Sequence, residues 1–361
     1  MTQVRLKNFK CFKDNTVDLA SLTILAGRNA VGKSSFIQAL CLISKRDLSP
    51  ENMIFSLKLN DVQNLVSTDE VLNHQAEDRK ILIKYEDQSF EFNCPEVSKG
   101  QLKLNNLKIV GRKTIPSAPR VKYLSAERVG PRISSDASED HFDLGFFGEK
   151  AWSVLGSIKT HNSRLDEDDR RILSGSSSLS TLKQIESWLS YIVSDSEFRV
   201  NIFEAVNQAK VEFRRRGHDS EYLSSTNYGF GVTYSLPIIV LGLTAELDEE
   251  RLVIVENPEA HLDPQGQSRM GQFLAYVAAQ GVRLLIETHS EHVVNGIRIA
   301  ILKEAIKSED VLFNFFSNDG GAVAIQKIAL NNKAELSSWP KGFMDQEEKD
   351  LAEIFKLQKQ K

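Results

Sequence analysis

Apolar and polar residues follow one another along the chain in patterns that predict strands and helices. Residues 4–9 alternate in the manner of a strand, and residues 17–25 continue the strand pattern up to a short buried run at 22–25. The following apolar residues have the i, i+3, i+4, i+7 spacing of a helix with one buried face: Phe36, Ala39, Leu40 and Ile43. The first 44 residues therefore predict strand, loop and helix in succession.

The middle of the chain has a different pattern. Short strand-like runs at 80–85, 89–92 and 102–110 predict antiparallel hairpins, and residues 121–125 predict one more strand, after which the chain should leave the sheet.

Residues 140–222 are polar and predicted to be mainly helical, with apolar positions at 151–158 and 182–193. The charge run at 166–171 reads as the exposed start of a helix.

The apolar density rises again after Tyr228. A continuous apolar run at 251–255 is typical of a parallel strand covered on both faces, and 282–286 predicts a second such strand. Between them, Asp263 and Pro264 begin a helix that Gly281 would end, with one apolar face formed by Met270, Phe273, Leu274 and Val277. This alternation predicts an α/β sheet whose ligands collect at the carboxyl ends of the strands.

Composition narrows the class of protein. The 361 residues carry a net charge of -4, which argues against coating nucleic acid through bulk electrostatics. No apolar run is long enough to span a bilayer, and the first residues lack the apolar core of a secretion signal, so a cytoplasmic protein without membrane contact is expected. Cys11, Cys41 and Cys94 are too sparse for a disulfide scaffold and are expected to be reduced.

The segment 27–34 has the form G-x-x-x-x-G-K-S of a phosphate-binding loop, placed between the first predicted strand and helix. Glycines allow the backbone to curl so that successive N–H groups and the helix N-terminus point at phosphate oxygens. Lys33 would reach the outer phosphates, and Ser34 would offer its hydroxyl to Mg²⁺.

Two further polar motifs follow predicted strands. Glu256, Asn257 and Glu259 come directly after the strand at 251–255, and the next strand ends at 287–290. Because carboxyl ends of parallel strands lie at one edge of a sheet, these motifs predict a second element of the phosphate site.

Taken together, the motifs resemble the ATP-binding heads of the ABC, SMC and RecF class, and more closely the stand-alone bacterial ATPases of the OLD-like group. The resemblance covers nearly the whole chain and is carried by residues 8–12, 27–35, 227–231, 256–264 and 287–290. The tail Trp339-Pro340-Lys341-Gly342-Phe343-Met344-Asp345-Gln346 is similar to a subgroup often found beside bacterial antiviral defence genes.

The resemblance implies an α/β fold: an ABC-type P-loop ATPase head with a mixed sheet, an antiparallel β subdomain and an inserted helical subdomain. The ATP-binding core would comprise residues 1–45 and 223–361, the antiparallel β part 46–139, and the helical insertion, a lid or partner-binding element, 140–222.

In such heads, two protomers meet face to face around two ATP molecules. Each ATP is held by the phosphate loop of one protomer and by the glycine-rich signature of the other. Here the signature would be Gly229-Phe230-Gly231 with Asn227, followed by a helix from about Val232 whose positive end points at the γ-phosphate. The alternative is a glycine turn before a core helix that contains Leu236, Ile238, Val240 and Leu241.

The resemblance also implies roles for single residues. Glu256 would hold Mg²⁺ together with Ser34, and His289 would be the switch histidine beside the γ-phosphate. Asp263 would belong to the loop that couples the two sites, a role compatible with its being a helix N-cap. The remaining implied nucleotide contacts are Lys10, Phe12, Arg128, Gly27, Arg28, Asn29, Ala30, Val31, Gly32, Lys33, Ser34 and Ser35.

Two positions depart from the family pattern. Asn257 stands where a glutamate usually acts as general base, and an amide orients water but cannot take its proton, so slow hydrolysis is expected unless Glu259 or a partner substitutes. Glu127 and Arg128 stand where a glutamine usually contacts magnesium and water; Arg128 would touch phosphate or pair with Glu127.

These features predict an ATPase that dimerises around ATP and Mg²⁺ and acts as sensor or scaffold for a separate effector, such as a nuclease, in antiviral defence. The alternative is a RecF-like DNA repair clamp that uses the basic run at 214–216. Residues 310–316 and 322–325 predict a pair of strands joined at 318–321. With these strands in the roughly 70 residues after His289, we expect no intrinsic nuclease domain there. A transporter subunit fits poorly because of the large insertion at 46–222 and the missing transporter-type signature.

Overall fold

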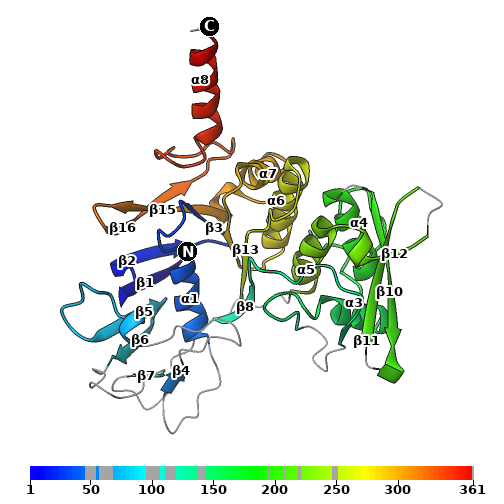
Figure 1. Cartoon of the computed structure of the whole chain (residues 1–361), viewed down its shortest axis with the longest axis horizontal. Helices are drawn as coiled ribbons and strands as arrows, with labels where there is room; N and C mark the ends of the chain where they lie inside the picture. Colours follow the sequence, from blue (N-terminus) through cyan, green and yellow to red (C-terminus); the bar gives the residue numbers. More distant parts are fainter. Residues whose placement is uncertain are drawn as a thin grey trace. The chain divides into compact units, whose positions relative to one another are not determined.

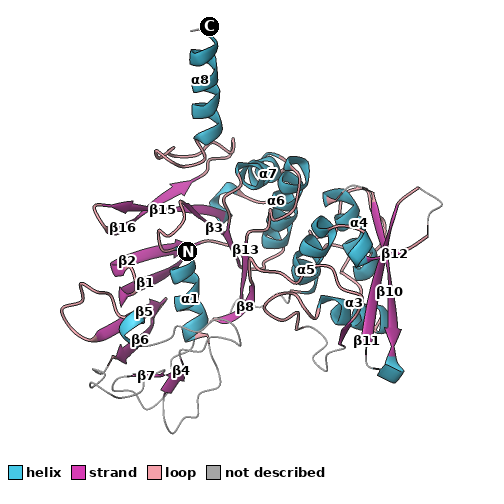
Figure 2. Ribbon diagram, in the orientation of Figure 1, coloured by secondary structure: helices cyan, strands magenta, loops and turns pink. Residues whose placement is uncertain are grey.

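The computed structural model describes residues 1–44, 54–56, 68–94, 106–109, 119–136, 143–193, 195–206, 208–217, 221–245 and 251–359 (Figures 1 and 2). The chain divides into two compact units. The first contains Met1–Val121, Leu312–Ala329 and Leu336–Lys361, and the second contains Lys122–Val311 and Leu330–Glu335.

An antiparallel sheet forms one part of the first unit. Strands β1 (Thr2–Phe9) and β2 (Phe12–Leu19) pair as a hairpin, with alternate β1 residues buried as the sequence pattern predicts. The sheet continues in the order β2-β1-β5-β6-β7-β4, with β5 (Lys80–Tyr85), β6 (Gln88–Asn93), β7 (Asn106–Ile109) and β4 (Ile54–Ser56). The short helix α2 covers Thr68–Val71.

The rest of the first unit carries the phosphate loop. Strand β3 (Leu22–Gly27) leads through the loop into helix α1 (Lys33–Ile43), and all four apolar positions predicted to face inward on α1 are buried. β3 neighbours β15 (Val311–Asp319), which pairs antiparallel with β16 (Ala322–Ala329) and so confirms the strand pair expected there. Helix α8 (Gln346–Gln358) follows.

In the second unit, β13 (Arg251–Glu256) and β14 (Leu284–Glu287) are parallel, as their apolar runs predict. They join β8 (Arg120–Leu124) in the order β14-β13-β8. Glu256 is in register with Glu287, so both strands end at one edge. The accompanying helices are α5 (Phe230–Thr244), α6 (Pro264–Ala279) and α7 (Glu291–Leu302).

Helices α6 and α7 touch backbone to backbone at two glycines. A Cβ on Gly271 would collide with the carbonyl oxygen of Val293, and one on Gly296 with that of Ser268. The missing side chains therefore let the two helices pack closely against each other.

The expected helical insertion is only partly helical. Helices α3 (Ala151–Thr160) and α4 (Thr181–Ile192) confirm both apolar helical stretches. Residues 196–215 instead form the antiparallel strands β10 (Ser196–Phe203) and β11 (Gln208–Arg215), extended by β12 (Leu223–Ser224) and β9 (Ser135–Asp136). The physical reason is the period-2 burial of Phe198 and Val200, which pair with Phe213 and Val211.

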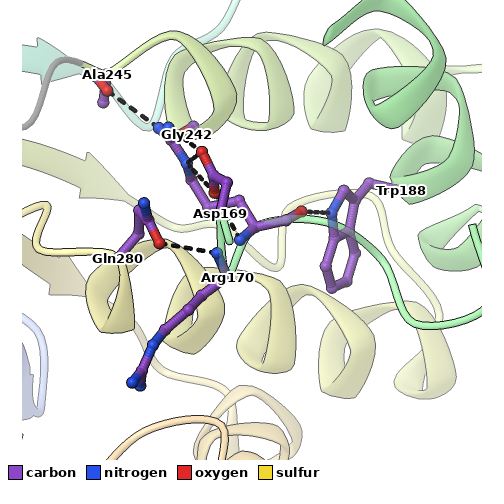
Figure 3. A network of polar contacts seen from close by, with 7 residues as sticks. Asp169, Arg170, Trp188, Gly242, Ala245 and Gln280 are labelled. Atoms are coloured by element: carbon purple, nitrogen blue, oxygen red, sulfur yellow. Dashed lines mark hydrogen bonds and ion pairs between the residues drawn. The ribbon is translucent and has the colours of Figure 1, made fainter. Parts of the chain in front are cut away.

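The charge run at 166–171 was wrongly predicted as an exposed helix start. Asp169 and Arg171 are buried and form a 2.6 Å ion pair, while Arg171 also donates to the carbonyl oxygens of Gly242 (3.2 Å) and Ala245 (3.0 Å). The indole N–H of Trp188 donates to the carbonyl oxygen of Arg171 at 2.7 Å (Figure 3). The ion pair of this non-helical loop is therefore buried in the protein. The hydrogen bonds with Trp188, Gly242 and Ala245 hold the loop against α4 and the end of α5.

Among the described residues, no helix has the length and apolar composition that a membrane crossing requires.

Candidate functional site

The phosphate loop in the first unit has the backbone geometry that phosphate binding requires. Gly27 (φ 136°), Ala30 (φ 60°) and Gly32 (φ 107°) lie in the left-handed region, so the loop curls before α1 begins. A Cβ on Gly27 would strike the carbonyl oxygen of Phe316, and one on Gly32 would lie 2.8 Å from Sγ of Cys11. Only glycine fits at these two positions.

Lys33 is the first residue of α1, and its ammonium lies against the backbone of the phosphate loop. The Nζ donates to the carbonyl oxygens of Gly27 (3.0 Å) and Arg28 (2.8 Å), and the residue is 3% exposed. Ser34, the next residue, is exposed at the helix N-terminus. The curled backbone, the ammonium and the exposed Ser34 together fit a polyphosphate with its magnesium ion.

The turn between β1 and β2 supports the loop. Phe12 is fully buried and packs edge-on against Phe316, with ring centroids 6.4 Å apart, so its ring forms the floor of the loop rather than a contact for adenine. Lys10 donates from Nζ to Oε1 of Gln38 on α1 at 2.6 Å, and burial lowers the pKa of its ammonium. Burial likewise raises the pKa of the Cys11 thiol. All three cysteines are free thiols, as the sequence predicts.

Glu256 ends β13 in the second unit. Its Oε2 accepts hydrogen bonds from the Tyr123 hydroxyl (2.8 Å) and from the main-chain N–H of Ala126 (3.3 Å), and the residue is 9% exposed. These contacts fix the carboxylate at the end of its strand. Sequence reasoning missed Tyr123, whose only signal was its position near the end of the strand predicted at 121–125.

Arg128 has neither of the roles expected of it. Arg128 is 2% exposed, and its guanidinium donates to the carbonyl oxygens of Ser125 (3.0 Å), Glu256 (2.7 Å) and Asn257. The Cζ atom lies 5.5 Å from the Tyr234 ring centroid. A buried guanidinium that is bound to three carbonyls does not face a phosphate, and it does not pair with the exposed Glu127. Burial lowers the pKa of Arg128 to about 10, so it remains charged at neutral pH.

Asn257 follows Glu256 in a left-handed turn (φ 45°), a conformation that asparagine tolerates better than most residues. Its main-chain N–H donates to the carbonyl oxygen of Glu287 at 2.8 Å. With the bond from Arg128 to its carbonyl, the backbone of Asn257 is held at both polar groups, so the turn after β13 is fixed.

Glu259 joins this turn to the loop after β14. Its Oε2 accepts from the Thr288 hydroxyl at 2.8 Å, and its Oε1 accepts from the main-chain N–H of His289 at 2.9 Å. His289 is exposed at the end of β14. Both oxygens of Glu259 are therefore used to position the His289 loop, which favours a positioning role over that of a substitute base.

Asp263 is the N-cap of α6. Its Oδ1 accepts from the main-chain N–H of Gly266 at 2.8 Å, and Pro264 occupies the first helical position, as the sequence predicts. The side chain is exposed, so capping leaves it accessible.

The signature Gly229-Phe230-Gly231 lies at the start of α5, which begins at Phe230, two residues before the expected start. Gly229 has φ 128°, and no described atom lies within 4 Å of the position of a Cβ there. A Cβ on Gly231 would lie 3.0 Å from the carbonyl oxygen of His261. Phe230 is 52% exposed, with its ring 5.3 Å from that of His261. Exposed Asn227 lies in the turn before it, and the predicted core residues Leu236, Ile238, Val240 and Leu241 are buried.

The family model of the AAA ATPase domain matches residues 1–117 and 132–294. The chain belongs to this AAA ATPase family. A second family model, of a protein of unknown function (DUF3696), matches residues 306–354. Comparison with curated proteins gives no sequence match.

This AAA ATPase domain has the fold of SMC heads. It is similar to the SMC head bound to the C-winged helix domain of ScpA, with a TM-score of 0.53 at 11% identity over 91% of this chain and 97% of that one. It is similar also to the SMC head with an extended coiled coil bound to the C-terminal domain of ScpA from Pyrococcus furiosus, with a TM-score of 0.52 at 11% identity over 98% and 100%. The expected ABC-type P-loop head is confirmed as the fold.

Each of the two units holds an oxygen donor of the kind that a phosphate-bound metal takes. No cluster of three or more His, Cys, Asp or Glu side chains that could hold a metal ion occurs in the part of the chain that the structure describes. Mg²⁺ prefers one or two protein oxygens together with phosphate oxygens and water, and Ser34 and Glu256 are donors of that kind.

Proposed function

We propose that this chain is an ATP-controlled switch in which two protomers close head to head around ATP and Mg²⁺. The phosphate loop of one protomer and the signature of the other would bind the same nucleotide. Hydrolysis to ADP and phosphate would open the pair.

The observation that carries the proposal is the geometry at Gly229. Its left-handed backbone stands at the N-terminus of a 15-residue helix, with open space where a side chain would be. The unpaired N–H groups of a helix start attract anions, and a bare glycine lets a ligand reach them. A γ-phosphate presented by a second protomer would be a ligand of this kind.

The chain's own residues supply positioning and charge. Lys33 would exchange its two carbonyl acceptors for phosphate oxygens, which are stronger acceptors because they are charged. Ser34 and Glu256 would each offer an oxygen to Mg²⁺, and Tyr123 keeps the Glu256 carboxylate in place. Bound Mg²⁺ supplies electrostatic stabilisation of the charge that develops on the transferred phosphoryl group.

The proposed site lacks a strong general base for the attacking water. Asn257 can orient a water molecule but does not accept its proton, and both oxygens of Glu259 are engaged by the His289 loop. We therefore propose slow or partner-stimulated hydrolysis, which prolongs the ATP-bound state.

A long-lived closed state suits a sensor or scaffold. The SMC heads to which the chain is similar in fold are bound to a separate protein, ScpA, and by analogy the closed pair would recruit a separate effector such as a nuclease. The proposed setting is bacterial antiviral defence in the cytoplasm, which rests on the motifs of the tail at 339–346.

The alternative, a DNA clamp, receives less support from the basic run at 214–216. Arg214 pairs with Glu197 at 2.8 Å, and Arg216 lies 3.6 Å from both Glu186 and Glu197. These ion pairs neutralise much of the patch.

Mass photometry at nanomolar concentration tests the switch directly. We expect wild-type protein to shift from monomer to dimer with ATP and Mg²⁺, and Lys33→Ala to stay monomeric. A wild-type monomer at saturating ATP would contradict the proposal, whereas salt-sensitive, ATP-dependent binding of duplex DNA would favour the clamp.

A further inference from the structure

Helix α8 presents an uncovered apolar face. None of its residues is buried, and Leu351, Ile354 and Phe355 are 47%, 48% and 60% exposed. Their i, i+3, i+4 spacing places these three side chains on one side of the helix. An isolated helix of this length is marginal in water, so a partner for this face would stabilise it.

The segment before α8 is anchored, which fixes the base of the helix. Phe343 is buried edge-on against Phe313 and Phe315 of β15, with ring centroids 6.2 and 5.6 Å apart. The Asp345 carboxylate accepts from the main-chain N–H of Gly342 at 2.9 Å and pairs with Lys349 at 2.6 Å. The apolar face is thus displayed from a fixed base.

Charges are segregated along α8. The first eight residues hold four acidic residues and Lys349, which pairs with Asp345, whereas the remainder holds only basic charges. The acidic residues are Glu347, Glu348, Asp350 and Glu353, and the basic ones are Lys356 and, at the C-cap, Lys359. A helix that is acidic at one end and basic at the other is complementary to an antiparallel copy of itself.

Glu348 and Lys359 lie on the same flank of the apolar face, because they are 11 residues, or about three helical turns, apart. In an antiparallel pair, residues on the same flank of the two helices face each other. Glu348 of each copy then lies opposite Lys359 of the other, while Leu351 packs against Phe355 near the two-fold axis.

We infer that α8 is a homotypic interface, which pairs antiparallel with α8 of a second copy of this chain. Two such short helices bury little area, so the contact alone is weak. It needs no nucleotide, and it would raise the effective concentration of one head near another. It is therefore separate from the ATP-dependent contact of the heads.

Sedimentation equilibrium at micromolar concentration, without nucleotide and with EDTA, tests the inference. We expect wild-type protein to show concentration-dependent dimerisation. Phe355→Asp should weaken the dimer about tenfold or more, because it buries a charge in the apolar face. The matched control is Leu357→Asp, since Leu357 is 53% exposed but lies off this face.

Charge reversal distinguishes self-pairing from every other partner. Glu348→Lys and Lys359→Glu should each weaken the homodimer, and the double variant should restore it. An equimolar mixture of the two single variants should form heterodimers more readily than either alone forms homodimers. Unfolding curves and ATP-analogue binding that match wild type show that the variants are folded.

A wild-type protein that is monomeric throughout this range would overturn the inference. So would a dimer that Phe355→Asp leaves intact, or single charge reversals that the double variant does not rescue. If these variants lose binding of a different protein to α8 but keep their self-association, the partner of α8 is heterotypic. That result would also overturn the inference.

Discussion

Arg128 donates a hydrogen bond to the main-chain carbonyl oxygen of Asn257, so a buried cation holds the residue that we predict to stand at the general-base position. The same guanidinium holds the carbonyl oxygens of Ser125 and Glu256. A residue that the sequence led us to expect at the phosphate or in a pair with Glu127 therefore fixes the backbone of Glu256 and Asn257, the residues proposed to bind metal and to orient water.

Replacement of Arg128 by methionine tests this role. Arg128→Met removes the donor to three carbonyls, and we expect it to lower the free energy of unfolding by about 3 kcal/mol. Urea denaturation measures the change. The control is Glu127→Gln at the exposed neighbouring residue, which should leave stability unchanged; a methionine variant as stable as wild type would show that the three bonds are dispensable.

Asn257→Glu should restore a general base and accelerate phosphate release by about 10²-fold. The left-handed backbone at this position costs glutamate about 1 kcal/mol of stability, so a modest decrease in melting temperature should accompany the gain. Steady-state phosphate release by the purified protein measures the rate, and Asn257→Gln is the control that adds length without a base.

One kinetic result would contradict slow hydrolysis at Asn257. Fast turnover by the wild-type protein alone, abolished by Glu259→Gln, would mean that Glu259 acts as the base despite its bonds to Thr288 and His289.

The carboxyl group of Glu212 should make the free energy of unfolding depend on pH. Hydrogen bonds from Arg199 (2.7 Å) and then from Lys210 lower the pKa of its carboxyl, since both partners favour the charged form. A lowered pKa means that the stabilisation is complete above the unfolded value of 4.5 and is lost as the pH falls through the folded value.

We therefore expect Glu212→Gln to lower the free energy of unfolding by about 1 kcal/mol at pH 7 and the difference from wild type to shrink at pH 3. Urea denaturation at the two pH values measures it. An equal difference at both would show that the carboxylate's charge contributes nothing.

Local patterns in the sequence predicted the elements that local physics determines. The order of strand, glycine loop and helix identified β3, the phosphate loop and α1, because each signal lies within a few residues of the next. The apolar run before Glu256 likewise identified a buried parallel strand, and Asp263 followed by Pro264 identified a helix start.

Contacts between distant segments could not be predicted in this way. Arg128 and the carbonyl of Asn257 are 129 positions apart, and nothing near Arg128 indicates a buried guanidinium. The charge run containing Asp169 and Arg171 resembles a solvated helix, because its buried partners Gly242 and Ala245 lie more than 70 positions away. The hairpin of β10 and β11 was missed because its polar outer residues obscured the alternation of its buried ones.

The central claim, a nucleotide site shared between two protomers, is tested most directly by mixing two inactive variants. Lys33→Ala removes the phosphate-loop ammonium, and Gly229→Asp places a carboxylate in the open space of the signature. Each variant alone should fail to hydrolyse ATP, whereas an equimolar mixture should recover phosphate release, up to about half of the wild-type rate, because each mixed pair has one intact site of two. A mixture as inactive as its components, although both variants are folded and form mixed pairs, would contradict the shared site.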